Sequence, residues 1–147
     1  METSLPAQTS APAPARTGVF LVDRLASECG MPFLGEGDLD LFLAGGGLRV
    51  VFVTGDPVKL LDTVDIAVIL PELCRHFSGK IEAGVLERKA EALVATRYGA
   101  DVRPALVFFA GARHLGTITR VRDWDEYLAK IADFIAQAGA TPAPTRQ

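Results

Sequence analysis

The sequence has few of the residues on which redox or metal chemistry is usually built. It contains only two cysteines, Cys29 and Cys74, among its 147 residues. They are far apart and match neither the CxxC spacing of a dithiol motif nor the Cys/His spacing of a zinc site. This spacing argues against a disulfide framework and against a structural metal, and it favours a reducing, cytoplasmic location. We expect no cofactor.

The sequence also lacks an excess of basic charge and any long apolar run. Its formal net charge is −3, which gives no basic stripe for nucleic acid. No apolar stretch approaches the roughly 18 residues of a membrane-spanning helix. The N-terminal region has no basic segment followed by an apolar core, as a secretory signal would. We therefore expect neither a nucleic-acid partner nor insertion into a membrane.

What the chain does contain is enough apolar sequence for one folded domain. Hydrophobic residues make up 49% of the chain, which suffices for one core at this length. Both ends are rich in small residues and proline, a composition that does not support a packed core. The expected organisation is a disordered tail over 1–17, a domain over 18–137 and a second disordered tail over 138–147.

Three strands are indicated by apolar residues, and glycine or proline residues stand near the ends of two of them, 48–53 and 105–110. Residues 48–53 and 105–110 are almost entirely apolar, as in strands covered on both faces. Gly111 permits a hairpin turn into a further strand over 114–120. A strand over 80–86 follows 48–53 through a helical crossover, which predicts a parallel pair.

Helices are predicted where apolar residues recur at three- and four-residue spacing. The expected helices cover 19–28, 39–43, 66–77, 87–98 and the segment opened by Asp123, with a loop over 58–64. Phe20 and Trp124 are expected on buried helix faces. Pro71 falls inside the third helix and is expected to kink it.

This order of elements resembles the thioredoxin fold. The resemblance implies an α/β domain with a mixed central sheet of about four to five strands flanked by helices. Pro104 stands where thioredoxins carry a cis-proline, so the resemblance implies a cis Arg103–Pro104 bond. The positions of the CxxC motif are held by Leu60-Leu61-Asp62-Thr63. Neither Leu60 nor Thr63 can supply the thiolate that dithiol exchange needs.

Three stretches narrow the resemblance to one family. They are Val53-Thr54-Gly55-Asp56-Pro57, residues 65–73 with the sequence DIAVILPEL, and residues 103–109 with the sequence RPALVFF. They are similar to the cysteine-less thioredoxin-fold accessory proteins encoded with uptake nickel–iron (NiFe) hydrogenases, the HupG/HyaE type. The resemblance implies a redox-inactive chaperone, not an enzyme, that binds the hydrogenase small-subunit precursor and its twin-arginine signal peptide before export. Other hydrogenase accessory proteins are further candidate partners.

In a thioredoxin fold an extended client chain lies beside the cis-proline loop, which directs attention to five residues. Arg103 and Pro104 would offer backbone for β-type pairing. Asp56, Asp62 and Asp65 would form an acidic rim for a twin-arginine peptide, because carboxylates bind guanidinium groups bidentately. The plainer interpretation is that these aspartates cap helices or a turn.

Two other functions remain open at this point. A monothiol oxidoreductase or peroxidase would use Cys29 or Cys74, and it would need an exposed thiol with a lowered pKa. A regulatory scaffold would instead dimerise through the face where the CxxC motif is missing, around Leu60.

Overall fold

Five strands form one mixed sheet in the computed structural model, which describes residues 20–56, 61–95 and 97–140. The elements in chain order are α1 (Phe20–Ser27), β1 (Phe33–Leu34), α2 (Leu39–Leu43), β2 (Leu48–Val53), α3 (Leu61–His76), β3 (Ile81–Leu86), the 3-10 helix η2 (Arg88–Ala90), α4 (Glu91–Ala95), β4 (Ala105–Ala110), β5 (Arg113–Thr119) and α5 (Trp124–Ala140). The strand order is β1-β3-β2-β4-β5. The tail expected over 1–17 lies outside the described residues.

The strand directions confirm the predicted sheet. β2 runs parallel to β3, and β4 pairs antiparallel with both β2 and β5. The remaining strand, β1, is parallel to β3 and has only two residues. A strand of that length is too short to show alternation, so the sequence gives no signal for it. Gly84 makes room for β1, because a Cβ there would lie 2.8 Å from Cδ1 of Leu34.

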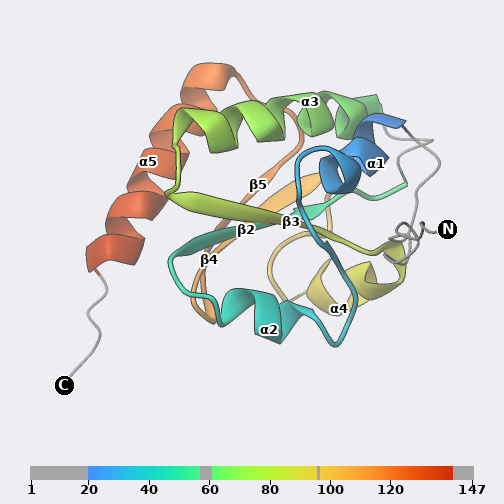
Figure 1. The fold of residues 1–147 in the computed structure, drawn as a ribbon, viewed down its shortest axis with the longest axis horizontal. Helices are drawn as coiled ribbons and strands as arrows, with labels where there is room; N and C mark the ends of the chain where they lie inside the picture. The colour runs from blue at the N-terminus through green and yellow to red at the C-terminus, as the bar shows by residue number, and fades with distance from the viewer. Residues whose placement is uncertain (1–19, 57–60, 96, 141–147) are drawn as a thin grey trace, which may run out of the picture.

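Helices cover both faces of the sheet, and this explains the continuous apolar strands (Figure 1). On one face, α1, α3 and α5 pack over Val50, Phe52 and Phe108. On the other face, α2 and α4 pack over Val51 and Phe109. Successive side chains of a strand point to opposite faces, so both sets of β2 and β4 residues must be apolar.

The β4–β5 hairpin has a glycine turn at one end and a backbone hydrogen bond to the cis-proline loop at the other. Gly111 takes a φ of 61° in the turn, and β5 begins at Arg113, one residue earlier than expected. The Arg103–Pro104 bond is cis, as the resemblance implied. The carbonyl of Pro104 accepts a hydrogen bond from the Arg120 backbone at 2.8 Å. The cis-proline loop is therefore held against the far end of β5.

Several helix boundaries differ from the predictions. α3 begins at Leu61, so residues 61–64 are helical and not part of a loop. The polar Thr63 suggested a loop, but its side chain is buried and its hydroxyl donates to the Thr54 carbonyl. The helix expected over 87–98 is reduced to η2 and the five-residue α4. α5 continues to Ala140, past the expected domain end at 137.

Two large side chains expected on buried faces are exposed. Phe20 lies at the start of α1 and is 71% exposed, while Val22 and Leu25 are the buried residues of that helix. Trp124 starts α5 and meets the ring of His76 edge-on, with ring centroids 6.0 Å apart. Both residues begin their helices, where fewer neighbours are available to cover a side chain.

None of the helices in the described ranges is long and apolar enough to cross a membrane.

Candidate functional site

The predicted site residues gather at one end of the sheet, where β2 ends and β4 begins. Val53 is paired with Ala105 across these two strands. The segments that extend them, 54–56 and 102–104, therefore lie next to each other. The first turns of α3 and the segment 88–91 join them through the hydrogen bonds described below. We call residues 54–56, 61–65, 88–91 and 102–104 the cis-proline face.

A buried carboxylate, Glu91, organises this face. Within the described ranges it is the one charged side chain classed as buried, with 1% exposure. Its Oε2 accepts the Gly55 backbone N–H at 3.0 Å and lies 3.3 Å from the Thr54 hydroxyl oxygen. Its Oε1 accepts from Nη1 of Arg103 at 3.1 Å and lies 3.4 Å from Nε of Arg88.

The contacts of Glu91 tie three segments into one unit. A buried charge is tolerated only where partners replace the water that it has lost. Here the partners come from the end of β2, from η2 and from the cis-proline loop. Glu91 therefore determines how these segments lie relative to one another, and it does so from beneath the surface.

Asp56 extends the same network to the surface. Its Oδ1 lies 3.9 Å from Nη1 of Arg88. The side chains of Arg88 and Asp56 are 48% and 35% exposed. The charges thus alternate from Arg103 to Glu91, Arg88 and Asp56, and the last two are accessible to solvent.

Asp62 and Asp65 lie on the first turns of α3, on the other side of the cis-proline face. Asp62 is half-buried and Asp65 is exposed. Burial raises the pKa of the Tyr127 hydroxyl; the Arg122 N–H and guanidinium oppose this shift, and the Glu126 and Asp62 carboxylates add to it. This influence places Asp62 near the start of α5. The three aspartates therefore form two groups, with Asp56 beside η2 and Asp62 toward α5.

Arg103 and Pro104 are less accessible than a binding role for their side chains would suggest. Pro104 is buried, and the Arg103 guanidinium is held by Glu91. The exposed apolar side chains on this face are Val102, just before Arg103, and Leu61, at the start of α3. The surface available to a partner is therefore apolar at Val102 and Leu61 and acidic beside them.

The positions of the missing CxxC motif hold no redox group in the part of the chain that can be described. Leu60 falls outside the described residues, Leu61 is exposed, and Thr63 is buried. The Thr63 hydroxyl donates to the carbonyl of Thr54 at the end of β2. This position therefore links α3 to the sheet and offers no nucleophile.

The two cysteines lie together, which their separation in sequence does not indicate. Cys29 follows α1 and Cys74 is on α3, and both line a solvent-open hollow of about 340 Å³ with Met31 and Pro71. Burial raises the pKa of the Cys74 thiol to about 11, with smaller contributions from Glu82 and Cys29. Thiolate catalysis needs the opposite shift.

Sequence reasoning missed Glu91 and Arg88. Within the expected helix 87–98 the apolar residues were assigned to the buried face, yet Leu93 is exposed and Glu91 is buried with Val94. A glutamate in a helix is ordinarily solvated, so its type gave no hint of burial. The one available signal was Arg103 beside the expected cis-proline, because an arginine at a crowded position needs a carboxylate partner.

Comparison with known proteins gives a consistent family. A family model described as the hydrogenase-1 expression protein HyaE matches residues 21–127. The hydrogenase expression/formation protein HoxO of Cupriavidus necator is 37% identical over 135 residues, which cover 90% of this chain and 84% of that protein. HupG of Rhizobium leguminosarum bv. viciae is 33% identical, with 79% of this chain and 80% of that protein covered.

Solved structures give the same fold. The crystal structure of the hydrogenase expression/formation protein HupG from Rhodopseudomonas palustris matches with a TM-score of 0.52 and 34% identity, covering 74% of this chain and 98% of that one. A thioredoxin from Halobacterium salinarum matches with a TM-score of 0.60 at 15% identity, covering 71% of this chain and 89% of that one. The thioredoxin similarity establishes a thioredoxin-like fold.

Proposed function

We propose, from the premise that this chain belongs to the HyaE family of hydrogenase expression proteins, that it acts in hydrogenase maturation as a redox-inactive chaperone. Its client is the small-subunit precursor of an uptake nickel–iron hydrogenase. It binds that precursor through its twin-arginine signal peptide, in the cytoplasm, before export. The names of its relatives support the role in hydrogenase maturation, and the client and its signal peptide are our proposal.

The observation that carries the proposal is the composition of the cis-proline face. A signal peptide has a positively charged segment followed by an apolar one. The face offers an apolar surface at Leu61 and Val102 and carboxylates at Asp56, Asp62 and Asp65. Leu61 and Asp62 are neighbours at the start of α3, so an extended peptide there can contact both kinds of surface.

Backbone pairing beside the cis-proline would hold the peptide without requiring a particular sequence. The Pro104 carbonyl already accepts the Arg120 N–H, so we assign the pairing to the backbone of Val102 and Arg103. The Arg103 side chain supports this loop through Glu91 and does not itself contact the peptide. Arg103 and Pro104 thus shape the site, and the aspartates select its ligand.

Client binding of this kind requires no catalysis, and the protonated state of the Cys74 thiol is consistent with this. Cys74 has a pKa of about 11, so almost none of it is thiolate at neutral pH. Both cysteines line a hollow between α1 and α3, and the proposed peptide site is built from other residues. We therefore place client binding at the cis-proline face and assign the cysteines no role in it.

The test is calorimetric titration of the protein with the small-subunit signal peptide and with a variant in which both arginines are lysines. We expect the arginine peptide to bind in the micromolar range, typical of a modest interface. Asp62→Asn and Asp65→Asn should each weaken it by about two- to fivefold, because an exposed charge pair contributes about 1 kcal/mol or less. Asp133→Asn on α5 is the matched control and should have no effect.

Two results would count against this site. Equal binding of the arginine and lysine peptides would show that the acidic rim does not distinguish guanidinium groups from ammonium groups. Binding of the signal-free subunit with no binding of the peptide would keep the chaperone role and remove the cis-proline face from it.

A further inference from the structure

We infer that Cys29, Met31 and Cys74 form a binding site for the soft monovalent metal ion Cu(I). The chain has two cysteines and two methionines, and three of these four sulfur side chains line one hollow of about 340 Å³. The hollow lies between α1 and α3, and none of its lining residues belongs to the cis-proline face. The site is therefore independent of the proposed peptide binding.

Two of the ligands come from a turn that is fixed against the end of α1. Gly30 separates Cys29 from Met31 and takes a φ of 73°, which turns the chain after the helix. The Cys29 N–H donates to the Arg24 carbonyl at 3.3 Å. The Met31 N–H donates to the Leu25 carbonyl at 3.0 Å. These bonds hold the backbone of both ligands in place, as a metal site requires.

The third ligand, Cys74, meets this turn from α3. Burial is the main reason why the pKa of its thiol is raised; Glu82 and Cys29 raise it further, and Arg75 lowers it. The contribution of Cys29 shows that the two thiols are close enough for their charges to interact. Met31 is 6% exposed, so the hollow combines a buried thioether with two half-buried thiols.

The three donor atoms are all sulfur, and this selects the metal. Thiolate and thioether sulfur prefer soft ions such as Cu(I), whereas Mg²⁺ and Ca²⁺ prefer oxygen. Structural Zn²⁺ takes four ligands from cysteine, histidine and carboxylate side chains. In the described ranges no three His, Cys, Asp or Glu side chains are placed to hold a metal. Two thiolates and one thioether therefore fit Cu(I) and do not make a zinc centre.

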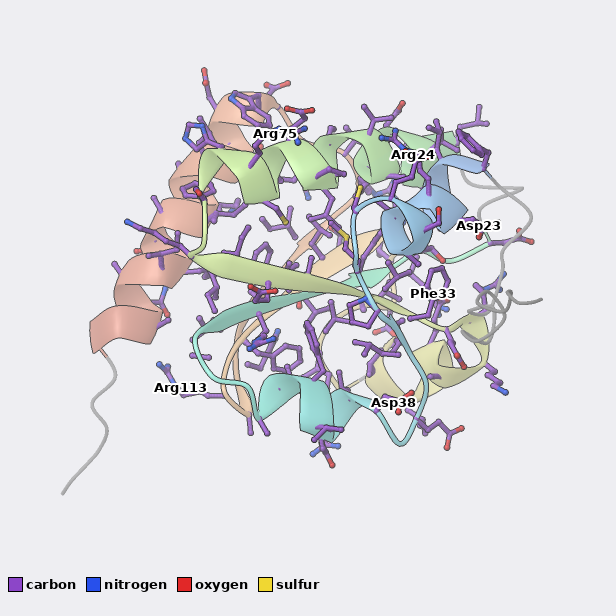
Figure 2. The ribbon with its side chains drawn as sticks, viewed as in Figure 1. Asp23, Arg24, Phe33, Asp38, Arg75 and Arg113 are labelled. Carbon is purple, nitrogen blue, oxygen red and sulfur yellow. The ribbon has the colours of Figure 1, made fainter. Side chains whose placement is uncertain are left out.

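The charges around the hollow suit a cation that is held by thiolates. Each thiol loses its proton when it binds a metal, so Cu(I) with two thiolates carries one net negative charge. Arg75 lines the hollow from α3 (Figure 2), and its guanidinium balances that charge. Glu28 also lines the hollow, but its carboxylate pairs with Arg24 at 3.3 Å. The hollow is open to solvent, which gives the ion a path to the sulfur atoms.

The experiment is titration of the pre-reduced full-length protein with Cu(I) in the absence of air, in competition with a chromophoric Cu(I) chelator. We expect one equivalent to bind and to give the ultraviolet charge-transfer absorption of a copper–thiolate bond. Cys29→Ser and Cys74→Ser should each weaken binding at least about a hundredfold, because each removes a ligand. Met31→Leu nearly conserves the side-chain volume and should weaken binding about tenfold. Glu28→Gln is the matched control in the same hollow and should have no effect.

Two measurements on the wild type keep the test independent of how the variants fold. One equivalent of Cu(I) should protect both cysteines from alkylation, as mass spectrometry of the labelled protein reports. An excess of Zn²⁺ should not displace the bound Cu(I).

Three results would overturn the site. Equal binding by wild type and by the Cys29→Ser/Cys74→Ser double variant would show an adventitious ion only, held elsewhere on the chain. Protection of one cysteine alone would show that the two thiols do not share a metal. Displacement of Cu(I) by Zn²⁺ would show that the ligands are not the sulfur set assigned to this hollow.

Discussion

At the scale of single residues, the ionisation of the Cys74 thiol is the property that distinguishes a chaperone from a thiol enzyme. The structure brings Cys29 and Cys74 to one hollow, as a redox protein would require. Burial nevertheless holds Cys74 in its protonated form, because a thiolate is poorly solvated there. Proximity to Cys29 therefore does not make Cys74 a thiolate nucleophile.

We predict slow alkylation of Cys74 with a steep pH dependence. A pKa of about 11 against the ordinary 9.0 leaves about a hundredfold less thiolate at pH 8, and only the thiolate reacts. In a Cys29→Ser variant, iodoacetamide labelling followed by mass spectrometry should be about a hundredfold slower than labelling of a free cysteine. The rate should rise about tenfold per pH unit up to about pH 11.

A Cys74 that reacts rapidly at neutral pH, with a rate independent of pH, would have a low pKa. That result would favour the monothiol oxidoreductase or peroxidase. The same measurement on a Cys74→Ser variant reports the reactivity of Cys29 separately.

At the scale of elements, Glu91 couples α4 to the end of β2 and to the cis-proline loop. We predict that Glu91→Ala lowers the free energy of unfolding by about 3 kcal/mol, because Arg103 loses its buried partner and the Gly55 N–H loses its acceptor. Urea denaturation measures this change. Glu91→Gln should cost less, since an amide oxygen can still accept one of these bonds.

Glu72→Ala is the control for the loss of an ion pair as such. Glu72 pairs with Arg75 across one turn of α3, and its side chain is 57% exposed. Its removal should change stability by less than about 0.5 kcal/mol. Equal effects of the two substitutions would show that the Glu91 network does not hold the face together.

The elements that the sequence predicted well are those defined by apolar periodicity. β2 and β4 were predicted residue for residue, because each run of six apolar or nearly apolar residues is bounded by glycine or proline. α4 and the start of α3 were not, because their boundaries depend on contacts across the fold. Thr63 is helical and buried, and its hydroxyl donates to the Thr54 carbonyl, a contact that the local sequence does not reveal.

At the scale of the whole molecule, the order of elements and a few local stretches were enough to indicate the fold and the family. The five predicted site residues lie at one end of the sheet, and their role in binding a client stays a prediction. The sequence could not reveal Glu91, since nothing local separates a buried glutamate from a solvated one. Nor could it reveal that Arg103 is engaged internally, because that contact joins residues of two different segments.

We propose that this chain holds the hydrogenase small-subunit precursor through its signal peptide. Size-exclusion chromatography of the purified protein with the precursor, and separately with the signal-free subunit, tests it most directly. We predict a complex with the precursor that is much weaker or absent without the signal peptide. Formation of the same complex with both forms would contradict recognition of the signal peptide, and formation with neither would contradict the chaperone role itself.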